Sequence, residues 1–273
     1  MDLFQVIILS LLQGITEFLP VSSSAHLILT PRLLGWADQG LVFDVAVHVG
    51  TLTAVMFYFR ADLLRMVSAG ATMFFGNRAQ MNGNGEINPD VRLAAMVLLA
   101  TLPAMLIGAV FHDQISTAFR DPLLIAAATV VFGLALLAAN RERSAAVNEF
   151  AIGWKIALLI GLAQTLAFIP GTSRSGITML AAVLLGLRRD AAARFSFLLS
   201  IPVILGAGFF KTVLLVQTGI AIDWLALGLG VFLSASSALL CIHLFLGFIE
   251  RIGFTPFVIY RLILGAVLLA IFV

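Results

Sequence analysis

The chain has 273 residues, of which 61% are hydrophobic and only 11% are charged. Soluble proteins average about 25% charged residues, so this composition excludes an ordinary soluble enzyme and predicts an integral membrane protein. The formal net charge of +2 gives no sign of a nucleic-acid partner, and the single cysteine excludes an internal disulfide and a thiolate metal cluster. The N-terminus has no basic stretch, so we expect no signal peptide.

The first half of the chain alternates apolar segments with polar turns. Segment 2–19 is apolar and ends at Pro20, and segment 25–35 is too short to cross a bilayer, which takes roughly 17–25 helical residues. Full-length spans are expected at 41–59, 91–111 and 122–140. A turn-rich loop at 76–90, the polar residues at 112–113 and 120–122, and a solvated linker that begins at Arg141 separate these spans and end the half.

The second half repeats this plan. Segment 152–169 is apolar and stops at Pro170, and segment 176–187 is again too short to cross. Full spans are expected at 195–217, 222–249 and 254–273. The sequence therefore predicts a single membrane domain over 1–273, built from internal repeats of about 1–140 and 152–273.

The basic residues indicate how the chain crosses the membrane. If 2–35 and 152–187 enter and return on the same side, eleven basic residues share one face: Arg60, Arg65, Arg78, Arg92, Arg141, Arg143, Lys155, Arg188, Arg189, Arg194 and Arg251. Four lie towards the other face: Arg32, Arg120, Lys211 and Arg261. Full crossings would divide them almost evenly, so the positive-inside rule favours the hairpins.

This topology predicts an all-α polytopic membrane protein with six transmembrane helices plus two re-entrant helix hairpins. Each half holds three spans, an odd number, so the halves form an inverted-topology repeat and the hairpins enter from opposite faces. Their polar tips can meet near the midplane, where irregular backbone is tolerated if it is buried in protein or lines a cavity. Both termini are expected on the outer face.

The tip of the first hairpin gathers polar groups within an apolar segment. They are Gln13, Glu17, Ser22, Ser23, Ser24 and His26. Ionisable groups at membrane depth usually mark function. Gln13 and Glu17 are four residues apart and share a helix face. The alternatives are a protonated, hydrogen-bonded Glu17, serines that cap the next helix, and a buried structural histidine; for His48, His112 and His243 the structural interpretation is favoured.

The tip of the second hairpin looks like an anion cradle. Its glycines, Gly171 and Gly176, allow close backbone approach, and Arg174 has a planar fork suited to phosphate oxygens. Hydroxyl groups come from Thr172, Ser173, Ser175 and Thr178. The N-terminal N–H groups of the following helix favour an anion. The alternative for Arg174 is a structural ion pair with Glu17, which is compatible with phosphate binding.

The two tips also resemble each other. Phe18, Pro20 and Ser23 match Phe168, Pro170 and Ser173 at the same spacing. An anion cradle that faces a hydroxyl, an imidazole and a carboxylate suits phosphoryl transfer on a lipid phosphate. We expect Ser23 to be the nucleophile, with His26, one helical turn away, as its general base or orienting group.

At these residues the chain resembles the bacterial undecaprenyl-diphosphatase family, of the BacA or UppP type. The run from Gln13 to Ser23 matches the family's (Glu/Gln)-x-x-x-Glu motif and the serines behind it, and Pro170–Gly176 matches its second signature. The likeness extends to Phe195–Leu199 and to Pro256-Phe257-x-x-Tyr260-Arg261. Many members have Glu where this chain has Gln13, which weakens the case for that position as a metal ligand.

The resemblance implies hydrolysis of undecaprenyl diphosphate to undecaprenyl phosphate and inorganic phosphate, which recycles the carrier used for peptidoglycan and confers bacitracin resistance. It also implies a divalent cation, Mg²⁺ or Ca²⁺, with Glu17 as a candidate ligand, and a place in the bacterial inner membrane with the site open to the outer face. The polyprenyl diphosphate and membrane lipids are the expected partners, and a homo-oligomer is left open. The alternative is a polyprenyl-phosphate flippase or anion transporter built on the same inverted repeat.

Overall fold

The computed structural model describes residues 1–75, 87–111, 121–141, 147–216 and 223–272, all in helices and short connections without a strand. The helices of the first half are α1 (Leu3–Phe18), α2 (Ser23–Leu34), α3 (Gly40–Tyr58), α4 (Arg60–Phe75), α5 (Pro89–Val110) and α7 (Pro122–Arg141). Those of the second half are η2 (Glu149–Ala151), α8 (Trp154–Gln164), η3 (Thr165–Phe168), α9 (Arg174–Leu184), α10 (Arg189–Val216), α11 (Trp224–Ile252) and α12 (Thr255–Phe272).

These bounds confirm the expected apolar segments, including the two short ones. Five helices among the described residues are long and apolar enough to cross a membrane: α3, α5, α10, α11 and α12. The chain is therefore a polytopic helical membrane protein. Helix α10 begins six residues earlier than expected, and residues 60–75, for which the sequence suggested no element, form α4. Most of the predicted loop at 76–90, the polar residues at 112–120 and most of the linker after Arg141 lie outside the described residues.

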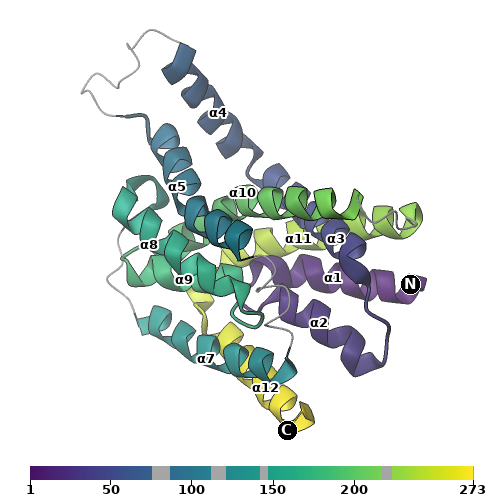
Figure 1. The fold of residues 1–273 in the computed structure, drawn as a ribbon. Coiled ribbons are helices and arrows are strands. Elements are labelled where there is room, and N and C mark those ends of the chain that lie inside the picture. The colour runs from purple at the N-terminus through teal and green to yellow at the C-terminus, as the bar shows by residue number, and fades with distance from the viewer. Residues whose placement is uncertain (76–86, 112–120, 142–146, 217–222, 273) are drawn as a thin grey trace.

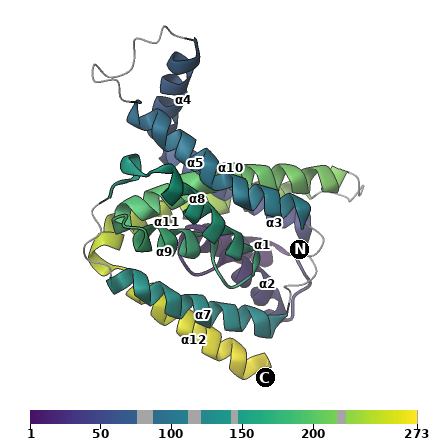
Figure 2. The ribbon, with the colours of Figure 1, turned by 60° about the vertical axis from the view of Figure 1, so that its left-hand side comes forward.

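The two hairpins approach each other from opposite sides of the molecule (Figure 1). Helix α1 packs along α11 and α3, and α8 packs along α5, so each hairpin is held by a long helix of the other half. Helices α7 and α12 pack along one another as a separate layer, seen at the bottom of both views (Figure 2). The largest cluster of buried side chains surrounds α9 and α10, whose residues Phe195 and Phe197 have no exposed surface.

The ends of several helices share one basic region. Arg92 donates to the carbonyl oxygens of Ile152 (3.2 Å) and Ala151 (3.2 Å). Arg194 pairs with Glu149 (2.6 Å) and Asp62 (3.3 Å). Segments near residues 60, 90, 150 and 190 therefore lie together in the fold.

Candidate active site

The tips of the two hairpins are in direct contact. The backbone N–H of Gly171 donates to Ser22 Oγ at 3.2 Å, and Ser175 Oγ donates to the carbonyl oxygen of Leu19 at 2.8 Å. Pro20 and Pro170, which cannot continue a helix, end the first leg of each hairpin and free these groups. The prediction that the two polar tips meet is confirmed.

Both tips contain one serine in the left-handed region of the backbone. Ser22 has φ 74° and Ser173 has φ 72°, and each immediately precedes the second helix of its hairpin. Such a conformation costs a non-glycine residue on the order of 1–3 kcal/mol and is typical of functional sites. The equivalence of Ser23 and Ser173 was therefore wrong by one residue: the structure pairs Ser22 with Ser173, and Ser23 with Arg174.

The carboxylate of Glu17 is the centre of the site. Its Oε2 accepts hydrogen bonds from Ser23 Oγ (2.6 Å) and Gln13 Nε2 (3.0 Å), and its Oε1 accepts one from Arg174 (2.8 Å). The Glu17 side chain is only 7% exposed. These contacts confirm the shared helix face of Gln13 and Glu17 and the ion pair between the hairpins. Since an ionised carboxylate only accepts hydrogen bonds, Ser23 directs its proton at Glu17.

The expected contact between Ser23 and His26 is not formed. His26 Nδ1 lies 2.7 Å from the carbonyl oxygen of Ser22, and Nε2 lies 2.5 Å from the hydroxyl of Tyr260. The two rings stack with centroids 5.8 Å apart. Because a carbonyl only accepts, Nδ1 carries a proton, and in the neutral ring Nε2 accepts from Tyr260. His26 therefore joins the first hairpin to α12, and the prediction of a Ser23–His26 pair was wrong.

The hydroxyl groups of the second tip mostly bond within the protein. Ser173 Oγ caps α9 by accepting the N–H of Gly176 at 3.1 Å. Thr178 Oγ1 donates to the carbonyl oxygen of Arg174 at 2.8 Å, and Ser175 holds the first hairpin as described above. Thr172 Oγ1, by contrast, is buried without a hydrogen-bond partner. These groups hold the tip in shape, and Thr172 alone of the four keeps a free hydroxyl.

The glycines of the second tip lie where a side chain would be crowded by its neighbours or would strain the backbone. Gly171 has φ 97°, and a Cβ atom there would lie 2.5 Å from the carbonyl oxygen of Ile125. At Gly176 a Cβ atom would lie 3.2 Å from Ser173 and 3.4 Å from Pro20 of the other hairpin. Gly171 therefore allows the second tip to pack against α7 in its positive-φ conformation, and Gly176 leaves room for the Ser173 cap of α9.

Backbone N–H groups at the start of both second helices remain free. Within the described chain, the N–H groups of Ser23 and Ser24 in α2, and of Arg174 and Ser175 in α9, donate to no protein acceptor. Unpartnered N–H groups and the positive end of the helix dipole attract anions. Together with Arg174, they give the site the donors that a phosphate needs beside the Glu17–Ser23 pair.

Arg261 of α12 is a site residue that the sequence analysis only counted among the basic residues towards the outer face. Its guanidinium is fully buried and donates to the carbonyl oxygens of Pro20 (3.1 Å), Gly171 (2.6 Å), Thr172 (3.0 Å) and Thr129 (3.2 Å). Arg261 of α12 is thus hydrogen-bonded to both hairpin tips. The signal was the motif that ends at Tyr260-Arg261, since a cation amid apolar residues seldom lies there without a partner.

His48 of α3 was also missed. Its Nε2 lies 3.8 Å from Glu17 Oε2, and its Nδ1 lies 2.7 Å from the carbonyl oxygen of Asp44. The His48 side chain is 30% exposed, against 7% for Glu17. Spacing could not reveal this contact, because the two residues lie on different helices.

The groups around Glu17 do not by themselves form a binding site for a divalent cation. Both Glu17 oxygens already bind protein donors, and no cluster of three His, Cys, Asp or Glu side chains suited to a metal occurs in the described ranges. Gln13 Oε1 is buried without a partner, but one amide oxygen is a small part of the six to eight that Mg²⁺ or Ca²⁺ takes. A metal-ligand role for Glu17 therefore finds no support in this geometry.

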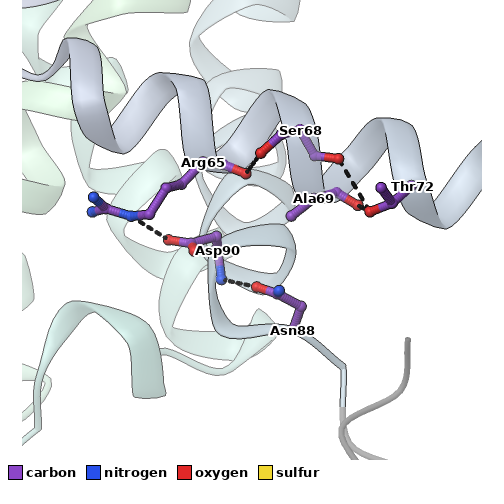
Figure 3. A pocket seen from close by; sticks show the side chains of 6 residues that line it. All are labelled: Arg65, Ser68, Ala69, Thr72, Asn88 and Asp90. Carbon is purple, nitrogen blue, oxygen red and sulfur yellow. Dashed lines mark hydrogen bonds and ion pairs between the residues drawn. The ribbon is translucent and has the colours of Figure 1, made fainter. Parts of the chain in front are cut away.

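A separate pocket lies between α4 and α5, far from Glu17 along the chain and in the fold. It has a volume of about 290 Å³ and is lined by Arg65, Ser68, Ala69, Thr72, Asn88 and Asp90 (Figure 3). Arg65 pairs with Asp62 and Asp90, so its charge is already compensated. Nothing in this pocket matches the predicted phosphate chemistry.

Comparison with known proteins gives full-length matches. The family model for the bacitracin resistance protein BacA matches residues 6–267. Undecaprenyl-diphosphatase 2 of Stutzerimonas stutzeri is 55% identical over 275 residues, covering 100% of this chain and 99% of the relative. Undecaprenyl-diphosphatase of Teredinibacter turnerae is 54% identical over 268 residues, covering 98% of each.

Proposed function

This chain belongs to the bacitracin resistance protein BacA family, and we propose that the site at Glu17 hydrolyses undecaprenyl diphosphate to undecaprenyl phosphate and inorganic phosphate. Relatives that are more than 50% identical over the whole chain bear the name undecaprenyl-diphosphatase. The observation that carries the proposal is the Ser23–Glu17–Arg174 cluster. It places a hydroxyl, its proton acceptor and an anion-binding guanidinium within hydrogen-bond distance.

In the first step, Ser23 Oγ attacks the terminal phosphorus. The Oγ–P bond forms, the bond from phosphorus to the bridging oxygen breaks, and undecaprenyl phosphate leaves. Glu17 takes the Ser23 proton across the 2.6 Å hydrogen bond, so Glu17 replaces His26 as the base. Arg174 and the free N–H groups of α2 and α9 stabilise the charge on the phosphoryl oxygens.

Six transmembrane helices and two re-entrant hairpins in inverted repeats remain the arrangement that we propose. The packing of the helices supports this arrangement. In the first half α1 and α3 both pack on α11, and in the second half their counterparts α8 and α10 both pack on α5. Helices α7 and α12, which end the two halves, pair with each other. The twenty residues of α7 would make it the sixth span.

We further propose that the protein lies in the bacterial inner membrane with both termini outside and the site open to the outer face. The basic region formed by Arg92, Arg194 and their neighbours would then face the cytoplasm. In this orientation the first hairpin enters from outside, and the partly exposed His48 lies beside Glu17. A divalent cation, Mg²⁺ or Ca²⁺, remains the cofactor that the family resemblance implies, and its chemical contribution would be to neutralise part of the diphosphate charge.

Phosphate release by the purified protein in detergent tests this function. The wild type should release inorganic phosphate from a polyprenyl diphosphate, and Ser23→Ala should release essentially none. Ser236→Ala is the matched control, because Ser236 is exposed on α11 and its hydroxyl bonds only to its own helix. A flippase or transporter would release no phosphate in either form, and a Ser23→Ala protein of normal rate would exclude Ser23 as the nucleophile.

A further inference from the structure

The second half of the reaction needs a base that the first half has not used. Once Ser23 has attacked, Glu17 carries the serine proton and can no longer accept one. Water must still be activated to hydrolyse the phosphoserine, because the attacking oxygen has to lose a proton as its bond to phosphorus forms. This requirement follows from the proposed function and rests on it.

Among the residues that the structure describes, two histidines lie close enough to the Glu17–Ser23 pair to be considered. Both ring nitrogens of His26 are already engaged, Nδ1 with the Ser22 carbonyl and Nε2 with Tyr260. His48 differs, because only its Nδ1 is hydrogen-bonded, to the carbonyl oxygen of Asp44. A carbonyl only accepts, so this bond keeps the proton on Nδ1 and leaves the lone pair of the neutral ring on Nε2.

The position of that lone pair also suits the task. Nε2 lies 3.8 Å from Glu17 Oε2, too far for a direct hydrogen bond, and Glu17 is bonded to Ser23. The His48 side chain is 30% exposed, whereas that of Glu17 is 7% exposed. The free lone pair therefore lies on a partly exposed ring beside the carboxylate that holds Ser23.

We propose that His48 is the general base for the second step. Nε2 accepts a proton from water as the water oxygen bonds to phosphorus. The bond between phosphorus and Ser23 Oγ breaks, and Glu17 returns its proton to Oγ. Inorganic phosphate leaves, His48 releases its proton to solvent through its exposed side, and both Glu17 and Ser23 regain their starting states.

The phosphorylated protein itself is the readout. Substrate labelled in its terminal phosphate is mixed with protein in detergent, the reaction is quenched with acid, and label on the chain is counted beside released phosphate. His48→Ala should accumulate label approaching one per chain while phosphate release falls on the order of 10²–10⁴-fold, the range for loss of a general base. Added imidazole should restore release by entering beside Glu17, and His48→Gln, which keeps a polar side chain but no base, should also accumulate label.

Controls separate this proposal from the function on which it rests. His243→Ala, an exposed histidine on α11, should behave as the wild type, and the double variant Ser23→Ala/His48→Ala should carry no label. If His48→Ala releases phosphate normally, or loses label and release together without rescue by imidazole, His48 is not the base. If the wild type releases no phosphate, the hydrolase function fails and this proposal fails with it.

Discussion

Replacing Arg261 by Met should loosen both hairpin tips at once. The guanidinium bonds to three tip carbonyls, those of Pro20, Gly171 and Thr172, and to Thr129 of α7. Hydrogen bonds between membrane helices are worth about 0.6 kcal/mol each on average and up to about 1.7 kcal/mol. Three lost tip bonds therefore predict a destabilisation of roughly 2–5 kcal/mol. Methionine fills much of the apolar volume but satisfies none of these oxygens.

The measurement pairs thermal unfolding in detergent with phosphate release at a temperature where the variant stays folded. Arg261→Met should unfold at a lower temperature and lose most of its turnover, because the tips that carry Ser23 and Arg174 lose their common support. Arg261→Lys has three donors on a point charge, so its unfolding temperature and rate should lie between those of the wild type and of Arg261→Met. Arg251→Met, at an exposed arginine of α11, should change neither. A wild-type unfolding temperature and rate for Arg261→Met would refute the reasoning.

Three further predictions concern the site itself. Arg174→Lys keeps the charge but loses the fork, so kcat should fall by roughly 30- to 1000-fold, the equivalent of about 2–4 kcal/mol; equal rates would show that a point charge suffices. Glu17→Gln removes the base and should lower the rate of Ser23 phosphorylation on the order of 10²–10⁴-fold. The dependence of activity on Mg²⁺ concentration should stay the same, and a shift in that dependence would instead make Glu17 a metal ligand. Ser24→Cys in a Cys241→Ala background should react with a membrane-impermeant thiol reagent outside intact cells. Ser24 suits this test because its side chain is exposed, whereas Val21 in the same tip is buried. Labelling only in inverted vesicles would mean that the site opens inward.

The helices and the two tips could be predicted because their causes are local. An apolar segment of limited length followed by Pro20 or Pro170 ends a helix whatever surrounds it. Glu17 drew attention because a carboxylate amid apolar residues needs a partner, and Arg174 was the cation in the matching tip of the second half. The ion pair of 2.8 Å between them joins two observations made separately on the sequence.

The rest of the site depends on contacts between distant segments. His48, Tyr260 and Arg261 reach the tips from α3 and α12, and their spacing along the chain carries no information about which helices pack together. His26 was misassigned for a related reason. One helical turn separates it from Ser23, but the Ser22 carbonyl and Tyr260 offer both ring nitrogens other partners, and only the tertiary structure shows that they are in place.

A difference of one residue between the tips explains how similar hairpins supply different chemistry. The left-handed serine follows its proline by two residues in the first tip, at Ser22, and by three in the second, at Ser173. The first residue of the next helix is therefore Ser23 in one hairpin and Arg174 in the other. Both point at the same carboxylate, Ser23 at Oε2 and Arg174 at Oε1 of Glu17. Equivalent positions of the two hairpins thus provide the proposed nucleophile and the cation, and one acid from the first hairpin is hydrogen-bonded to both.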